Sequence, residues 1–200
     1  MTGRTPAEVR PADVPDAAGI AEVYRPYVTD SVASFETVAP DAAELARRML
    51  AAPRLPWLVA CRDGAVVGYA YAGRHRSRAA YRWSVDCSVY LTAAEQGAGT
   101  GRALYARLLP ELAALGHVTA FAGIALPNPA SVGLHTALGF TAVGTYRAVG
   151  FKLGAWWDVG WWQRRLGEPA VPPAPPVDLP DLPEEAARKA LAAGVPLLET

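Results

Sequence analysis

The sequence predicts an α/β fold in which one mixed central β-sheet carries helices on both faces. Three observations lead to this expectation. Strand-like and helix-like patterns alternate along residues 8–166, a hairpin signal joins two β-rich runs, and a glycine-dense turn connects a strand to a leucine-patterned helix. Hydrophobic residues make up 52% of the 200-residue chain. This length and composition suit one domain with an appendage.

The first expected elements are a short strand and two helices. Residues 8–12 form the strand candidate, and Asp13 can cap a helix that runs to about residue 30. Asp41 and Glu44 have the spacing of a capping box, which predicts a second helix that ends near Pro53.

Three antiparallel strands are expected next. The pair Asp63–Gly64 lies between the β-rich residues 57–62 and 65–73, and this pair is typical of a type I′ hairpin turn. Residues 82–92 continue as the third strand.

A helix is expected from about Gly99 to Leu115, because leucines recur there at helical spacing. Pro110 lies inside this helix and should kink it. A buried strand, a short helix with Gly139 as its C-terminal stop, and two last strands should follow. These four elements occupy residues 117–126, 129–139, 140–151 and 158–166.

Proline marks the expected domain boundary. Eight of the 18 prolines follow Gly167, so residues 1–166 are expected to form the domain and residues 167–200 an appendage. Residues 168–183 read as a polyproline-like linker. Residues 184–194 are rich in helix formers and stop at Gly194, but a helix this short needs a surface to pack on. We expect no catalytic role for this tail.

The charge balance and the cysteine count exclude several classes of function. The 19 basic residues match the 19 acidic ones, which argues against a nucleic-acid-binding surface. Cys61 and Cys87 are too few for a disulfide framework, the three histidines are scattered, and we expect no metal site. No apolar run has the length of a membrane span or of a signal-peptide core. We therefore expect a cytoplasmic protein without a membrane partner.

The most informative segment is residues 89–102, where a strand runs into a glycine-dense turn that opens a helix. Backbone N–H groups in such a turn can converge on an anion at the positive end of the helix. Gly97, Gly99 and Gly101 would let a pyrophosphate approach closely. The dinucleotide pattern G-x-G-x-x-G fails because residue 102 is arginine, and no lysine follows as a P-loop requires. A plain glycine-rich turn is the alternative.

Two motifs in sequence order resemble the GNAT (GCN5-related N-acetyltransferase) superfamily. Gln96, Gly99 and Gly101 fit its Q/R-x-x-G-x-G/A pyrophosphate loop, and residues 128–140 are similar to the segment with which it grips pantetheine. The resemblance implies a GNAT fold with strands splayed at the acetyl-CoA site. It also implies an acetyl-CoA site made of Val89, Tyr90, Leu91, Gln96, Gly97, Ala98, Gly99, Thr100, Gly101, Arg102, Asn128 and Ser131.

Residues 8–166 are similar to the phosphinothricin (methionine sulfoximine) N-acetyltransferase group within this superfamily. The matching segments are residues 34–37, 56–60, 68–73, 78–85, 88–90, 126–129 and 158–160. The resemblance implies an enzyme that acetylates the primary amine of a small amino acid or analogue.

The resemblance also implies the proton-transfer residues. A primary amine is an ammonium at neutral pH, so a base must remove a proton before the amine attacks. The group carries a glutamate for this task where the present chain has Asp86, which is one methylene shorter and is expected to act through a water. His135 is expected to protonate the departing thiolate. The alternatives are a solvated or arginine-paired Asp86 and a His135 hydrogen-bonded to a backbone carbonyl.

For the acceptor, the resemblance implies that Arg78 and Tyr81 bind the carboxylate and that Phe35 packs on the side chain. Arginine suits a carboxylate because its planar fork makes two parallel hydrogen bonds. Leu153 and Trp157 replace histidines that are common in the group, and Ala98 replaces a basic residue. These departures imply a more apolar acceptor pocket.

Two further hypotheses remain open at this point. The acceptor could be a polyamine, an antibiotic or a protein N-terminus, or the chain could be a catalytically silent CoA-binding module.

Four of the six tryptophans fall within residues 156–162, and alternating strand faces cannot bury all of them in one core. We therefore expect a homodimer that forms through the last strands.

Overall fold

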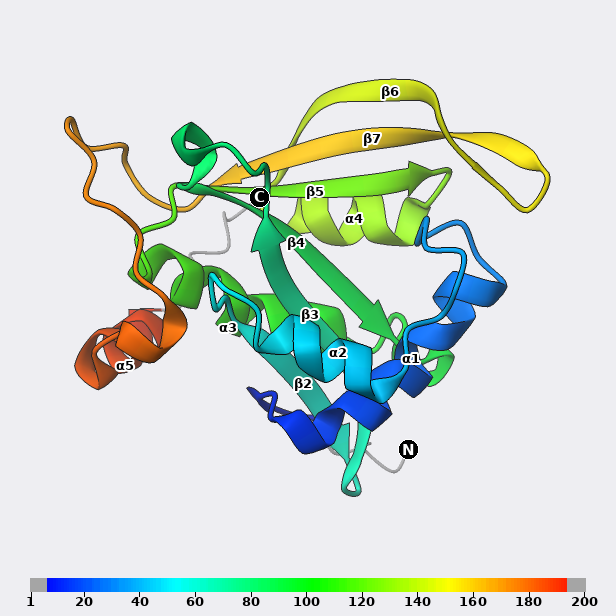
Figure 1. Cartoon of the computed structure of the whole chain (residues 1–200), viewed down its shortest axis with the longest axis horizontal. Helices are drawn as coiled ribbons and strands as arrows, with labels where there is room; N and C mark the ends of the chain where they lie inside the picture. The colour runs from blue at the N-terminus through cyan, green and yellow to red at the C-terminus, as the bar shows by residue number, and fades with distance from the viewer. Residues whose placement is uncertain (1–6, 194–200) are drawn as a thin grey trace.

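The computed structural model describes residues 7–193 and contains one seven-stranded sheet in the order β1-β2-β3-β4-β5-β7-β6 (Figure 1). Only β4 and β5 pair in parallel, and all other neighbours are antiparallel. The strands are β1 Glu8–Pro11, β2 Trp57–Arg62, β3 Ala65–Arg74, β4 Ser84–Leu91, β5 Thr119–Leu126, β6 Thr141–Lys152 and β7 Ala155–Arg165. The helices are α1 Ala17–Thr29, α2 Ala42–Met49, α3 Thr100–Ala114, α4 Pro129–Ala137 and α5 Glu184–Ala193. The predicted α/β class and the order of elements are confirmed.

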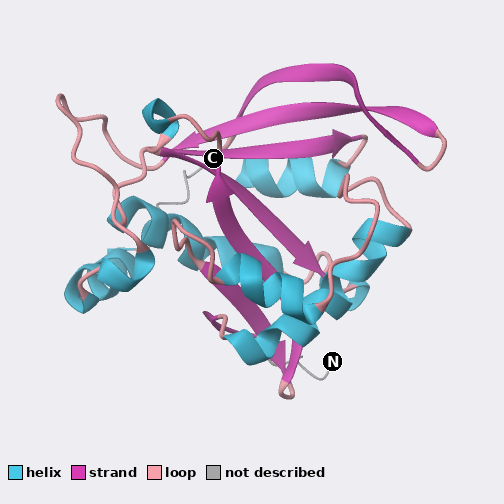
Figure 2. Cartoon of the chain, in the orientation of Figure 1, coloured by secondary structure: helices cyan, strands magenta, loops and turns pink. Residues whose placement is uncertain are grey.

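Helices cover both faces of the sheet (Figure 2). Strand β2 shows how: Leu58 and Ala60 join the core beneath α3, whereas Val59 and Cys61 join the core beneath α1 and α2. This division follows from the alternation of side chains along a strand.

The predicted hairpin turn is confirmed between β2 and β3. Asp63 and Gly64 have φ angles of 51° and 79°. Two residues with positive φ define the type I′ turn, whose twist matches that of the flanking strands.

The first two helices differ from prediction at their ends. A 3₁₀ turn over Val14–Asp16 precedes α1, and the carboxylate of Asp16 accepts the N–H of Asp13 at 2.8 Å. Asp13 is thus the N-cap residue of this turn rather than of α1, whose own N-cap position is Asp16. The side chain of Asp41 accepts the N–H of Glu44 at 2.8 Å and caps α2 as predicted. This helix ends at Met49, before the predicted end near Pro53.

Helix α3 continues through the buried Pro110, so this proline does not interrupt it. The leucines that predicted the helix, among them Leu104, Leu108 and Leu112, are fully buried against the sheet. Their burial supplies the tertiary packing on which helices in proteins mainly depend.

The proline-rich segment lies along the domain. The indole N–H of Trp83 donates to the Ala174 carbonyl at 2.7 Å, and the N–H of Val177 donates to the Leu115 carbonyl at 3.0 Å. Beyond this segment α5 contacts α3, which supplies the surface that a short helix needs. The predicted stop at Gly194 lies outside the described residues. Within residues 7–193 no helix is both long and apolar enough to cross a bilayer.

Candidate functional site

The site is built on a gap in the sheet. Strands β4 and β5 pair only where Ser84–Asp86 face Thr119–Phe121, and beyond these residues they diverge (Figure 1). Strand β4 keeps its antiparallel partner β3 as far as Leu91. Because backbone groups of a strand point alternately to its two sides, the β5-facing groups beyond Asp86 have no strand partner. The predicted splay is confirmed.

A cavity of about 420 Å³ fills this gap. One wall is residues 87–91 of β4, the other is residues 122–125 of β5, and the glycine turn and α4 close its end. Every residue that the sequence assigned to acetyl-CoA lines the cavity except Ala98 and Thr100.

The glycine turn has the backbone conformation that only glycine adopts readily. Gly97 and Gly99 have φ angles of 74° and 86°, and Gly99 is the N-cap of α3. A Cβ atom on Gly101 would lie 3.1 Å from Leu134 Cδ2, so this glycine lets α3 approach α4. The turn thus presents N–H groups and a helix N-terminus to the cavity.

A buried carboxylate holds the turn in place. Glu95 is fully buried, pairs with Arg62 at 3.0 Å and accepts the Thr100 hydroxyl at 2.6 Å. Thr100 is therefore occupied inside the fold and does not face the cavity. An ion pair buried in this way must keep its partners, because a lone buried charge is costly.

Tyr27 is a cavity residue that sequence reasoning missed. Its hydroxyl donates to the Leu91 carbonyl at 2.6 Å and accepts the side-chain amide of Gln96 at 3.2 Å. Tyr27 thereby joins α1 to the end of β4 and to the glycine turn. No local pattern could reveal a contact between residues this far apart in sequence.

His135 lines the cavity, but both of its ring nitrogens are engaged. Nδ1 lies 2.8 Å from the Ser131 carbonyl, and Nε2 lies 2.9 Å from the Tyr105 hydroxyl. A carbonyl can only accept, so Nδ1 carries the proton and Nε2 accepts from Tyr105 in the neutral ring. Burial lowers the pKa of His135. This geometry matches the alternative of a histidine hydrogen-bonded to a backbone carbonyl.

Asp86 lies at the last paired position of β4, beside the cavity residues Cys87 and Ser88. Its Oδ1 is 2.6 Å from Nδ1 of His75. Burial raises the pKa of Asp86, and the hydrogen bond from His75 opposes this rise. From the sequence, His75 was only one of three scattered histidines, and no role was predicted for it. The antiparallel register that pairs Gly73 with Asp86 is what brings it there.

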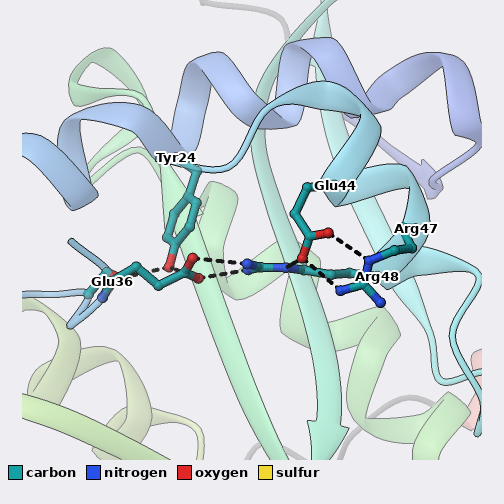
Figure 3. A network of polar contacts seen from close by, with 6 residues as sticks. Tyr24, Glu36, Glu44, Arg47 and Arg48 are labelled. Atoms are coloured by element: carbon teal, nitrogen blue, oxygen red, sulfur yellow. Dashed lines mark hydrogen bonds and ion pairs between the residues drawn. The ribbon is translucent and has the colours of Figure 1, made fainter. Parts of the chain in front are cut away.

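The loop that carries Phe35 is held by a polar network (Figure 3). Glu36 accepts the Tyr24 hydroxyl at 3.0 Å and two Arg48 nitrogens at 2.7 and 3.0 Å. Phe35 packs on β6, where a Cβ atom on Gly150 would lie 2.2 Å from its ring. Phe35 is 38% exposed and does not line the 420 Å³ cavity.

Arg78 and Tyr81 line a second cavity of about 300 Å³, which the tail residues 175–178 help to close. Among residues 7–193 the Arg78 side chain has no hydrogen-bond or ion-pair partner. The Tyr81 ring lies edge-on to His75, with 6.1 Å between their centroids. This loop is therefore near the Asp86 carboxylate, although it does not border the gap between β4 and β5.

Comparisons with known proteins agree with this geometry. The family described as "Acetyltransferase (GNAT) domain" matches residues 9–161. The phosphinothricin N-acetyltransferase of Streptomyces viridochromogenes is 44% identical over 179 residues, which cover 87% of this chain and 96% of that protein. The L-methionine sulfoximine/L-methionine sulfone acetyltransferase of Salmonella typhimurium is 40% identical over 171 residues, which cover 83% and 98%.

Among solved structures, the phosphinothricin acetyltransferase of Sinorhizobium meliloti in complex with AcCoA is similar with a TM-score of 0.79. The two chains are 39% identical, and the match covers 88% of this chain and 97% of that one.

Replacement of Gly99 by valine should raise the KM for acetyl-CoA at least tenfold, because the turn would lose its positive φ and a side chain would enter the phosphate path. Steady-state kinetics at saturating amine would measure the change. Gly64→Val is the matched control, since Gly64 also has positive φ and open space around its Cβ position but lies in the β2–β3 turn. Unchanged acetyl-CoA kinetics in a folded Gly99→Val protein would contradict the assignment of the turn.

Proposed function

Since the chain belongs to the acetyltransferase (GNAT) family, we propose that it transfers the acetyl group of acetyl-CoA to the primary amine of a small amino acid or analogue. It is an N-acetyltransferase, and acetyl-CoA is its cofactor. The observation that carries the proposal is the glycine turn beside the gap between β4 and β5, with Asp86 at the last paired position of β4 before that gap. Asn128 and Ser131 would contact the pantetheine arm there.

The reaction begins with removal of a proton from the acceptor ammonium. Asp86 takes this proton through a water, the free amine attacks the thioester carbonyl, and negative charge develops on its oxygen. A backbone N–H within residues 89–91 stabilises that oxyanion. The C–S bond then breaks, and the thiolate takes a proton to leave as CoA thiol. Two protons leave the nitrogen in total, and one is released to solvent.

His135 is the candidate donor of the thiolate proton because its ring lies in the cavity wall. Its Nδ1 proton would have to leave the Ser131 carbonyl, and the second proton lost by the acceptor nitrogen would restore the neutral ring through solvent. This route needs no charged imidazole before the step, which suits a ring whose pKa is lowered by burial.

Recognition of the acceptor is assigned to Arg78, Tyr81 and Phe35. Arg78 is free to form a two-pronged bond with a carboxylate or phosphinate. Trp157 and Leu153, which is 58% exposed, make the neighbouring hairpin more apolar than histidines would. A polyamine, an antibiotic or a protein N-terminus is the second candidate acceptor class. The neutral net charge of the chain disfavours the polycationic acceptors among them, which usually meet an acidic cleft.

A homodimer through β6 and β7 is part of the proposal. Strand β6 is the edge of the sheet, and six large apolar side chains on this hairpin are between 49% and 65% exposed. They are Val143, Tyr146, Val149, Phe151, Leu153 and Trp156. Exposed apolar patches and open strand edges both favour association.

We also place the protein in the cytoplasm, where acetyl-CoA is available and the unpaired Cys61 and Cys87 stay reduced.

Arg78→Ala should weaken binding of acidic acceptors by roughly 1.5 to 3 kcal/mol, because one hydrogen-bonded charge pair is lost. The measurement is acetyl-CoA turnover against a panel of amines, with and without a carboxylate or phosphinate. KM should rise only for the acidic amines, and Arg25→Ala on α1 should change neither set. An equal loss for both sets would assign Arg78 another role, and no turnover with any amine would favour a silent CoA-binding module.

Asp86→Asn should lower kcat by about 10² to 10⁴ and leave acetyl-CoA affinity unchanged, because the base is lost and the cofactor cavity is not. The loss should shrink as pH rises, since more of the amine then arrives deprotonated. Activity of the parent enzyme should fall as pH drops through the raised pKa of Asp86, because a protonated carboxyl cannot accept a proton. Asp86→Glu should retain activity, and Asp41→Asn is the control. Parental kcat at every pH in Asp86→Asn would remove Asp86 from the mechanism.

Light scattering at micromolar concentration should give twice the 21.1 kDa chain mass. Phe151→Asp with Trp156→Asp should give the single-chain mass, because two charges would be buried at the interface. Val171→Asp is the control, since Val171 is 96% exposed in the tail. A single-chain mass for the parent protein would refute the dimer.

A further inference from the structure

His75 packs against three aromatic rings next to the Asp86 carboxylate. Its ring stacks on Phe121 of β5 with 4.2 Å between centroids and 14° between planes. Trp161 of β7 and Tyr81 lie edge-on at 5.9 and 6.1 Å. The His75 side chain is only 12% exposed. A ring held in this way has little freedom to turn away from Asp86.

The hydrogen bond defines which atoms remain available. An ionised carboxylate can only accept, so at 2.6 Å the Nδ1 of His75 must donate its proton to Oδ1 of Asp86. Within residues 7–193 no further side chain bonds to Asp86, and its side chain stays 32% exposed. Oδ2 is therefore the oxygen that an approaching water or amine can reach.

We propose that His75 is the positioning residue of the catalytic carboxylate: its Nδ1–H holds Oδ1 of Asp86 so that Oδ2 faces the water that takes the acceptor proton. The inference rests on the proposed function and adds a residue to it. The Asp86 side chain can rotate unless another group holds it in one orientation. The hydrogen bond from His75, whose ring packs against Phe121 of β5 and Trp161 of β7, holds it.

The same bond keeps the carboxylate ionised. Burial raises the pKa of Asp86, whereas the hydrogen bond and charge of His75, together with the charge of Arg76, lower it. The other titratable neighbours are Tyr71 on β3, Cys87 on β4 and Tyr81 in the loop before β4. The residues that approach from β5 and β7, Phe121 and Trp161, carry no titratable group.

The proton balance is simple. One N–H bond of the ammonium breaks, the bridging water passes its own proton to Oδ2 and takes the ammonium proton, and Asp86 becomes neutral. The Nδ1–H bond of His75 stays intact throughout. After transfer Asp86 returns its proton to solvent, so His75 never acts as the base.

The test is a variant series built on His75→Phe, which keeps an aromatic ring against Phe121 but removes the donor. We expect kcat to fall about tenfold, the effect of one lost hydrogen bond to a charged group, with the KM for acetyl-CoA unchanged. The acid limb of the kcat/KM profile should move to higher pH, because the carboxylate keeps its burial and loses its donor. His75→Asn restores an N–H donor near the position of Nδ1. It should recover part of kcat and move the acid limb part of the way back to its parental pH.

Two comparisons separate positioning from other roles. In an Asp86→Asn background, His75→Phe should cause no further loss, because the two residues act as one unit. Glu111→Gln, at a buried carboxyl of α3 that lines neither cavity, should change neither rate nor pH profile. A loss in His75→Phe as large as in Asp86→Asn, or an acid limb that does not move, would overturn the proposal.

A direct measurement keeps this inference separate from the proposed function. Carbon-13 NMR of the Asp86 carboxyl in the full-length protein, without any amine, should show a higher pKa in His75→Phe than in the parent. An unshifted Asp86 pKa would overturn the role of His75 even if the enzyme acetylates amines. A shifted pKa in a protein that acetylates none would instead overturn the function and leave the pair intact.

Discussion

The parting of two parallel strands is the constraint on which the rest of the structure depends. Beyond Asp86 and Phe121 the strands β4 and β5 no longer bond to each other, and a sheet in the middle of a domain rarely leaves backbone groups without partners. Residues around the cavity supply partners for some of these backbone groups. The Tyr27 hydroxyl bonds to both the carbonyl and the N–H of Leu91, and residues 87–91 line the cavity.

Local signals were sufficient where one segment determines its own conformation. Asp63–Gly64 predicted its turn because both residues must adopt positive φ. The glycines at 97 and 99 predicted a turn that an anion can approach closely, and both have positive φ in the structure. The splay of β4 and β5 was predicted only from the family resemblance, because no residue pattern within either strand indicates where their pairing stops.

Contacts between distant segments could not be read in the same way. His75 meets Asp86 only through the register of β3 on β4, and Tyr27 meets Leu91 across 64 residues. His135 matched its motif, yet its hydrogen bonds to Ser131 and Tyr105 depend on how α4 packs against α3. The composition of the proline-rich tail is typical of a linker. Only its hydrogen bonds to Trp83 and Leu115 show that it packs along the domain.

The proline-rich tail lies against the loop between β3 and β4, which carries Arg78. The Trp83 indole bonds to Ala174, and residues 175–178 close over the cavity that holds Arg78. The loop between β3 and β4 is thus held by a segment of its own chain. Its conformational entropy is lost during folding and need not be lost when an acceptor arrives. The tail can therefore increase the affinity of this loop for a small molecule by ordering the loop in advance.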